Sequence, residues 1–397
     1  GDAPPIYTID LSLPPAERYV ELAQAFKADI QGLTGLFDDV VGSLYPDISI
    51  TTIRRLAKVF LRRLHSKEQT EEIRGISRVT GVEMYLLVCF NTLLDMLMGC
   101  SSGGIRSECS DGEVRMLHFR TLDWGMDSLR KIVVQLEFVD RPHGRVLARS
   151  ITYVGFVGVL TGVRPALGAQ EGLSLSLNFR PRHNDSDSRL ANLRYYGNHV
   201  LVLLGLRPSI SSRLRGFILP PAMRRSLESS GHKDEALPDL AKLTKDLPSA
   251  TTTAAYIIAS NGAVTTVFEK DRATALIRSS SSFVIATNHD LMFEPSPESQ
   301  PPISSPHTQE TAVLTDLQDL LDESIDRKQC MEARWKKAVR RFGKKHPGTT
   351  DEDVFVGIED VVRWVRRWPV TNECTHFACV MDPVEGEILW VRRWMEP

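Results

Sequence analysis

The sequence predicts an α+β protein in which layers of antiparallel sheet are covered by helices. Two observations predict this class. The first hundred residues carry apolar side chains at helical spacing, whereas the chain after Cys100 changes to alternating apolar and polar residues. The predicted strands also cluster in two blocks with helical patterns between them, which is typical of sheets packed against helices.

The N-terminal hundred residues contain three predicted helices. A first helix follows Pro14 and Pro15, with an apolar stripe through Tyr19 and Phe26, and proline is tolerated in a first helical turn. A second spans 53–64, and a third spans 83–98. The third is apolar on most sides, so we expect it to be buried.

The helix at 53–64 has two interpretations. Leu56 and Phe60 belong to an apolar stripe, and Arg54 and Arg63 belong to a basic opposite face. A basic amphipathic helix of this kind binds an anionic membrane surface. It is also what a packed helix with a solvated charged face looks like, and the sequence leaves both interpretations open.

The rest of the chain alternates between strand and helix patterns. Strands are predicted at 115–119, 132–139, 146–154, 173–178, 255–259, 264–269, 283–287, 376–381 and 388–392. Helical patterns cover 192–206 and 311–341. Long loops are predicted at 293–307, which is rich in Pro and Ser, and at 343–353.

Composition excludes several classes of protein. The chain has 397 residues, 42% of them hydrophobic and 25% charged, which are ordinary globular proportions. Its net charge of −2 does not indicate a nucleic-acid partner. No apolar run reaches about 18 residues, so no transmembrane helix is expected.

The six cysteines are too few for a disulfide scaffold, and they lack metal-ligand spacing. Cys374 and Cys379 are close enough in sequence to pair across a tight turn in an oxidising compartment. The glycine-rich run through Gly155, Gly158 and Gly162 has no following helix start, so we expect close backbone packing rather than a nucleotide site. No cofactor or metal is predicted.

Several polar residues follow or end predicted elements. Cys100 follows the apolar helix and precedes Ser101-Ser102-Gly103-Gly104. Arg120 and Asp123 lie three apart at the end of a strand, and Asn178 and Asn288 close two others. Each is a weak signal alone, because a lone cysteine or an Arg–Asp pair is structural in most proteins.

Together, and in this order, these motifs resemble the N-terminal-nucleophile amidases of the acid ceramidase, N-acylethanolamine acid amidase and conjugated bile acid hydrolase group. The likeness extends over nearly the whole chain. It is carried by Tyr7-Thr8-Ile9-Asp10-Leu11-Ser12-Leu13-Pro14-Pro15, Phe90-Asn91, Gly99-Cys100-Ser101-Ser102, Tyr153-Val154-Gly155, Gly158-Val159-Leu160-Thr161-Gly162 and Thr287-Asn288-His289-Asp290.

The resemblance implies a four-layer αββα fold and a self-cleaving precursor. It implies cleavage between Gly99 and Cys100, which divides the chain into a helical small subunit (1–99) and a catalytic region (100–397) that remain associated. Cys100 would be the nucleophile. The freed α-amine would be its base, since an amine with a pKa of about 7.7–8.0 suits that role.

The resemblance also gives roles to the other polar residues. Asp123 would hold the new amine, and Arg120 would orient the nucleophile and the substrate carbonyl. Asn178 would donate to the oxyanion, and Asn288 would orient substrate or amine. A later arginine of the family is matched by Arg327, with Arg334 as the alternative.

Two departures from the family concern the substrate. Phe119 stands where the family has a small residue, and Phe179 stands where acid ceramidase has an acid. With Trp124, these side chains predict an apolar substrate pocket. Small Gly99 and the following residues predict a flexible, exposed peptide at the cut.

Three functions fit this pattern. The first is a cysteine amidase that hydrolyses a lipid-like N-acyl amide through an acyl-thioester on Cys100. The second is an N-acyltransferase on the same fold, and the third is a catalytically silent lipid-binding relative. The resemblance suggests a lysosomal, vacuolar or secreted location, whereas the sequence itself leaves the compartment open.

Overall fold

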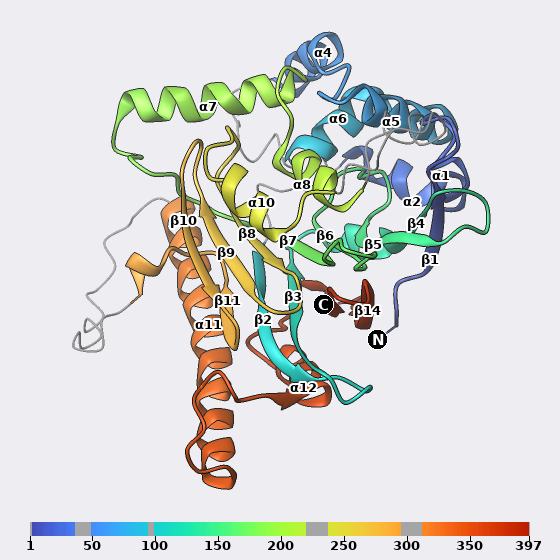
Figure 1. The fold of residues 1–397 in the computed structure, drawn as a ribbon. Coiled ribbons are helices and arrows are strands. Elements are labelled where there is room, and N and C mark those ends of the chain that lie inside the picture. Colours follow the sequence, from blue (N-terminus) through green and yellow to red (C-terminus); the bar gives the residue numbers. More distant parts are fainter. Residues whose placement is uncertain (1, 36–48, 94–98, 220–236, 295–311, 397) are drawn as a thin grey trace.

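Two β-sheets packed face to face form the centre of the molecule, and helices cover both outer faces (Figure 1). The structure is a computed structural model, and it describes residues 2–35, 49–93, 99–219, 237–294 and 312–396. The predicted α+β class and the four-layer αββα arrangement are confirmed. None of the helices in these ranges is both long enough and apolar enough to cross a bilayer.

The larger sheet has eight strands, in which β1 pairs parallel with β4 and every other neighbouring pair is antiparallel. From edge to edge it contains β1 (Ile6–Asp10), β4 (Val133–Val139), β5 (Val146–Tyr153), β6 (Thr161–Arg164), β7 (Leu173–Phe179), β8 (Ala255–Ser260), β9 (Thr265–Lys270) and β10 (Ala275–Ser280). The smaller sheet contains β11 (Phe283–Ala286), β2 (Gly99–Glu108), β3 (Val114–Asp123), β13 (Thr375–Asp382) and β14 (Glu387–Arg393), and the short β12 (Val356–Gly357) pairs with β2.

The helices fall into two groups, one for each outer face. The N-terminal and middle helices belong to the side of the larger sheet: α1 (Val20–Ala25), α2 (Lys27–Gly32), α4 (Ile50–Phe60), α5 (Lys67–Thr80), α6 (Met84–Leu93), α7 (Arg189–Leu203), α8 (Ile210–Ile218) and α10 (Leu240–Asp246). The smaller sheet is covered by α11 (Ala312–Lys345) and α12 (Ile358–Val365). Short 3₁₀ helices lie at Leu33–Gly35, Asp127–Ile132 and Leu291–Phe293.

Strand alternation gives the two faces of each sheet different chemistry. On β7, Leu175 and Leu177 join the apolar core beneath the helices, whereas Ser174 and Ser176 point toward the other sheet. There they contact His118 of β3, whose two ring nitrogens lie 2.8 Å from the two serine hydroxyls. The space between the sheets is therefore partly polar, and its polar groups are paired with one another.

A second apolar core lies between the smaller sheet and α11. Phe119 of β3 stacks on Phe283 of β11, and Phe283 stacks on Trp335 of α11. All belong to one cluster that also contains residues of α12. Phe119 therefore faces away from the space between the sheets.

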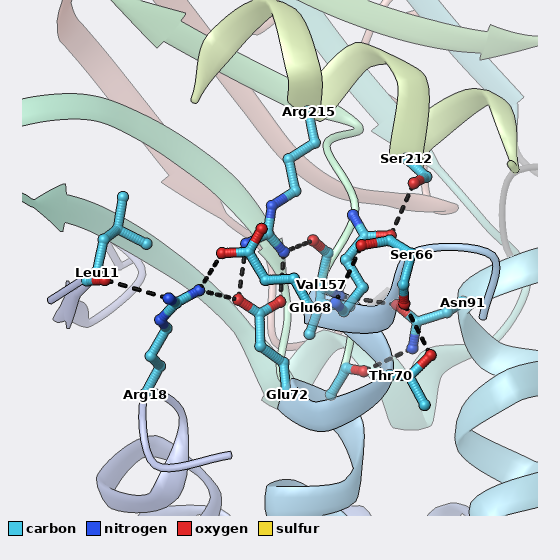
Figure 2. A network of polar contacts seen from close by, with 12 residues as sticks. Leu11, Arg18, Ser66, Glu68, Thr70, Glu72, Asn91, Val157, Ser212 and Arg215 are labelled. Atoms are coloured by element: carbon cyan, nitrogen blue, oxygen red, sulfur yellow. Dashed lines mark hydrogen bonds and ion pairs between the residues drawn. The ribbon is translucent and has the colours of Figure 1, made fainter. Parts of the chain in front are cut away.

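A buried ionic network joins the N-terminal region to the rest of the fold. Figure 2 shows Glu72 of α5 between Arg18 and Arg215, the latter on α8. Arg18 also donates to the carbonyl of Leu11, and Arg215 to the carbonyl of Val157. Because a buried carboxylate is stable only when its oxygens are paired, this network fixes α5 against α8.

The structure confirms the nine predicted strands and adds five, namely β1, β2, β6, β10 and β12. The most important addition is β2. Its first residues were expected to be flexible and exposed, but residues 100–105 lie buried inside the sheet. Small side chains allow this, since a Cβ on Gly103 would approach the carbonyl oxygen of Val284 to 2.1 Å. The helix predicted at 83–98 is seen as α6 as far as Leu93, and residues 94–98 lie outside the described residues.

Three further expectations can be compared with the structure. Cys374 directly precedes β13 and Cys379 lies within it, so they are separated along an extended strand by about 15 Å, too far for a disulfide. Gly158 confirms close backbone packing, because a Cβ there would lie 2.8 Å from the hydroxyl of Ser211. Most of the predicted loop at 293–307 lies outside the described residues.

The N-terminal basic helix only partly matches the packed interpretation. In α4, Ala57 is buried, but Leu56, Val59 and Phe60 are each more than half exposed. Helix α7, which lies along the same edge of the molecule (Figure 1), also carries exposed apolar side chains, among them Leu193. The two helices thus expose apolar surface to solvent.

Candidate active site

Cys100 is the second residue of β2 and lies fully buried between the two sheets. Alternation along β2 directs its side chain toward β7, where Sγ lies 3.9 Å from the carbonyl oxygen of Leu177. Its neighbour Ser102 points the same way and accepts a hydrogen bond from Ser176. The local sequence of small residues thus places a thiol at the edge of the polar layer.

The environment of the thiol has opposing effects on its pKa. Burial raises the pKa of Cys100 above its usual value, and the nearby Asp123 carboxylate raises it further. The guanidinium groups of Arg120 and Arg327 lower it, as does the main-chain N–H of Phe179. Since burial has the largest effect, the sulfur of the continuous chain is held mainly as a neutral thiol.

Arg120 is the cation nearest to the sulfur. It lies on β3, where its partner in the register with β2 is Ser102, and it is fully buried. Its Nη2 donates to Cys100 Sγ at 3.4 Å, and its Nη1 donates to Asn178 Oδ1 at 2.9 Å. Asn178 therefore fixes the guanidinium from the opposite sheet.

Asn288 is brought to Cys100 by strand register. Ala286 of β11 pairs with Ser102 of β2, so two residues further on the chain passes Cys100. There Asn288 Oδ1 accepts the Cys100 main-chain N–H at 2.7 Å.

Helix α11 supports this asparagine with side chains one turn apart. Arg327 Nη2 donates to Asn288 Oδ1 at 2.9 Å, and Ser324 accepts the Asn288 main-chain N–H at 2.7 Å. The structure thus brings Arg327 to the site. The alternative, Arg334, instead donates to the carbonyl of Trp364.

Asp123 ends β3 directly opposite Gly99. Its Oδ1 accepts a hydrogen bond of 2.6 Å from the hydroxyl of Thr375, whereas its Oδ2 is buried and has no hydrogen-bond partner among the described residues. Burial raises the pKa of Asp123, and Arg327, the Thr375 hydroxyl and Arg120 lower it. A buried carboxylate oxygen without a donor is costly, and this one lies beside the Gly99–Cys100 bond.

The predicted pocket residues do not form one apolar surface. Phe119 was expected in the pocket, but it lies on the other face of β3, against α11, because neighbouring strand residues point to opposite faces. Trp124 is buried in the core against Tyr153 and His376. Phe179 is half-buried beside the site, and its carbonyl accepts from Asn288 Nδ2 at 2.8 Å.

The expected oxyanion donor is also engaged in other contacts. The Nδ2 group of Asn178 donates to the main-chain carbonyls of Ala286 and Thr287, at 3.1 and 3.3 Å. In the continuous chain Asn178 therefore positions Arg120 and β11. The main-chain N–H of Phe179, by contrast, is directed at the sulfur.

Sequence analysis did not identify the groups that β13 contributes. Thr375 holds Asp123, and His376 joins the hydroxyl of Tyr153 to the carbonyl of Trp124, at 2.8 and 2.9 Å. These residues belong to no motif, and their only sequence signal is that they begin a strand. Within the described ranges, no cluster of His, Cys, Asp and Glu has the composition of a metal site.

This arrangement is suited to nucleophilic attack by sulfur on a carbonyl. The Cys100 thiol lies next to the fixed guanidinium of Arg120, and the main-chain N–H of Cys100 donates to Asn288. A bare carboxylate oxygen lies close to the preceding peptide bond. If that bond were cut, the new α-ammonium of Cys100 would be formed next to this carboxylate.

Comparison with known proteins gives a consistent result. The family model for the beta subunit of N-acylethanolamine-hydrolyzing acid amidase matches residues 2–65. Acid ceramidase of Rattus norvegicus is 29% identical over 190 residues, covering 44% of this chain and 45% of the relative, and acid ceramidase of Homo sapiens is 26% identical over 192 residues, covering 45% and 46%. The matched part thus spans about half the length of these relatives.

A solved structure shows a weaker geometric likeness. It is that of the Caenorhabditis elegans ortholog of N-acylethanolamine-hydrolyzing acid amidase, at 20% sequence identity and a TM-score of 0.44. The match covers 72% of this chain and 93% of that one.

Proposed function

We propose that the chain is a self-processing cysteine amidase acting on lipid-like N-acyl amides, a proposal supported by its similarity to acid ceramidase and to the beta subunit of N-acylethanolamine-hydrolyzing acid amidase. The observation that carries the proposal is the pairing of a buried thiol at Cys100 with the unpartnered Oδ2 of Asp123, on either side of one peptide bond.

The first reaction is cleavage of the chain itself. The sulfur of Cys100 attacks the carbonyl carbon of Gly99, and the C–N bond breaks as the nitrogen takes up the thiol proton. This leaves a thioester and a free α-amine on Cys100. Water then hydrolyses the thioester, giving the Gly99 carboxylate and restoring the thiol. The products are fragments of 99 and 397 − 99 = 298 residues.

The second reaction repeats this chemistry on a substrate. The free α-amine of Cys100 accepts the thiol proton while sulfur attacks the amide carbonyl, and it later passes that proton to the leaving amine. Asp123 holds the ammonium form, and Arg120 steadies the sulfur. The developing oxyanion is stabilised by the Phe179 N–H, and Asn288 orients the cysteine through its main-chain nitrogen. Water then releases the fatty acid from the acyl-thioester.

Surface chemistry supports a lipid-like substrate. The exposed apolar residues of α4 and α7 include Phe60 and Leu193, and α4 also carries Arg54, Arg55 and Lys58 on exposed positions. Apolar side chains would insert at the boundary of an anionic membrane, and each nearby cation would add about 1 kcal/mol of attraction. We therefore place substrate delivery at this edge. The resemblance to acid ceramidase, and not the surface chemistry, suggests a lysosomal, vacuolar or secreted location.

Intact-mass spectrometry tests the proposal directly. The purified chain is incubated at mildly acidic pH, and the masses of the two fragments are followed together with release of fatty acid from an N-acyl amide. Two fragments divided at Gly99–Cys100, followed by hydrolysis, are expected. An active form that remains one chain would contradict the amine-base mechanism. Adding an acceptor amine during the assay shows whether acyl transfer competes with hydrolysis.

A further inference from the structure

We infer that Thr375 is a positioning residue for this reaction, which acts by holding one oxygen of Asp123 so that the other faces the α-amine of Cys100. This rests on the proposed function. No motif singled out Thr375, and its role follows from how β13 meets the end of β3. The chain has a buried control residue, Thr371, only four positions away.

A β-bulge directs Thr375 at the site. Thr375 pairs with Asp123, but the next pair along the strands is Phe377 with Leu122, so His376 is an extra residue on β13. Such a bulge changes the direction of the side chains around it, and bulges are common beside active sites. Here it allows two neighbouring residues, Thr375 and His376, both to contact the end of β3.

The hydrogen bonds of Thr375 direct its hydroxyl hydrogen at Asp123. Its oxygen accepts the main-chain N–H of Asn372 at 3.0 Å, which fixes the hydroxyl in place. Its single hydrogen is then donated to Asp123 Oδ1 at 2.6 Å, the shorter of its two donor contacts, the other being 3.4 Å to Asn372 Oδ1. With Oδ1 engaged, the carboxylate plane is set, and Oδ2 is the oxygen left for the amine.

The second residue of the bulge anchors the same strand end. His376 Nε2 lies 2.9 Å from the Trp124 carbonyl, which can only accept, so this nitrogen carries the proton. Nδ1 must then accept from the Tyr153 hydroxyl at 2.8 Å. The Trp124 N–H in turn donates to the carbonyl of Cys374. Asp123 is thus held by its side chain and through the residue that follows it.

The electrostatic consequence has a definite sign. The charged or titratable groups acting on Asp123 come from every neighbouring element: Arg120 on β3, Cys100 on β2, Tyr153 on β5, Arg327 and Glu323 on α11, and Cys374 before β13. Among these influences, the Thr375 hydrogen bond lowers the pKa of Asp123. Removing this hydrogen bond therefore raises the pKa of Asp123, so that on acidification the carboxylate becomes protonated at a higher pH than in the wild type.

The test compares four variants of the full chain with the wild type. T375V and T375A remove the hydroxyl, T375S keeps it, and T371V removes a different buried hydroxyl, one that donates to the Val365 carbonyl at 2.6 Å. Each is assayed for the rate of self-cleavage, for kcat and KM of the cleaved form, and for the acidic limb of the pH–rate profile. T375A guards against misfolding caused by the bulk of valine.

We expect T375V and T375A to lower kcat about 10- to 100-fold with little change in KM, and to move the acidic limb to higher pH. T375S should restore both values, and T371V should keep the wild-type profile. An active wild type with an unmoved acidic limb in T375A, or a T375S variant as impaired as T375A, would overturn this inference alone. A wild type that neither cleaves nor hydrolyses would instead overturn the proposed function.

Discussion

Replacing Asp123 by asparagine removes one negative charge from the site and little else. Asparagine has the same shape, and its carbonyl oxygen can still accept from the Thr375 hydroxyl, as Asp123 Oδ1 does at 2.6 Å. What is lost is the anionic Oδ2 that is buried beside Gly99 and Cys100. The variant therefore isolates the charge of Asp123 from its packing.

The size of the effect follows from burial. Asp123 is 3% exposed, and breaking a buried charge pair by removing one partner costs about 3–5 kcal/mol. Since 1.36 kcal/mol is a factor of ten in rate, we expect Asp123→Asn to lower kcat/KM roughly two to four orders of magnitude. The matched variant is Asp127→Asn. That side chain is 58% exposed and pairs with Arg130, so its loss should cost about 1 kcal/mol or less.

The assay measures fatty-acid release by both variants after self-cleavage, together with the extent of cleavage by intact mass and the melting temperature. The melting temperature separates loss of activity from loss of fold. Equal rates for Asp123→Asn and Asp127→Asn would refute the proposed role of Asp123. A normal rate for Asp123→Asn would also show that the bare carboxylate oxygen has no part in catalysis.

Three other changes test separate parts of the structure. Cys100→Ala should abolish both cleavage and turnover, whereas Cys109→Ala should keep both, as judged by intact mass and product release; burial raises the pKa of Cys109 to about 11 and it lies outside the site. Glu72→Gln should lower the free energy of unfolding by about 3–5 kcal/mol, measured by denaturant titration, because it leaves two buried guanidinium groups without their shared carboxylate. His118 has a pKa lowered to about 3 by burial, so the unfolded chain binds its proton first and stability falls as the pH drops below about 6.5. Between pH 6.5 and 4.5 this costs about 2–3 kcal/mol, and His118→Gln should lose less stability over that interval than the exposed control His346→Gln; an identical loss in both would contradict the reasoning.

The positions of the strands and of several site residues were predictable because they depend on local pattern. Alternation identified β3, β7 and β11, and the polar residues Asp123, Asn178 and Asn288 stand at or just after their ends. Periodicity of this kind reflects which side chains of a strand are buried, and it can be recognised from the sequence of that strand alone. The likeness to a known family then ordered these ends into one site.

The start of β2 could not be predicted in the same way. A run of Cys, Ser and Gly carries neither the apolar alternation nor the branched side chains that mark a strand. It becomes a buried strand because β3 and β11 enclose it, and because its small residues allow a close approach on both faces. Residues 99–104 therefore form a strand because of their pairing with β3 and β11 and not because of their own sequence.

The sequence by itself therefore determined the α+β class, the helical N-terminal region and most of the residues of the candidate site. Only the tertiary structure decided which face Phe119 takes, which arginine reaches Asn288, and which oxygen of Asp123 is left bare. Each of these depends on contacts between residues far apart in the chain, such as Asp123 with Thr375, 252 positions away. Spacing along one strand carries no information about such contacts, because register, sheet stacking and a single bulge set them.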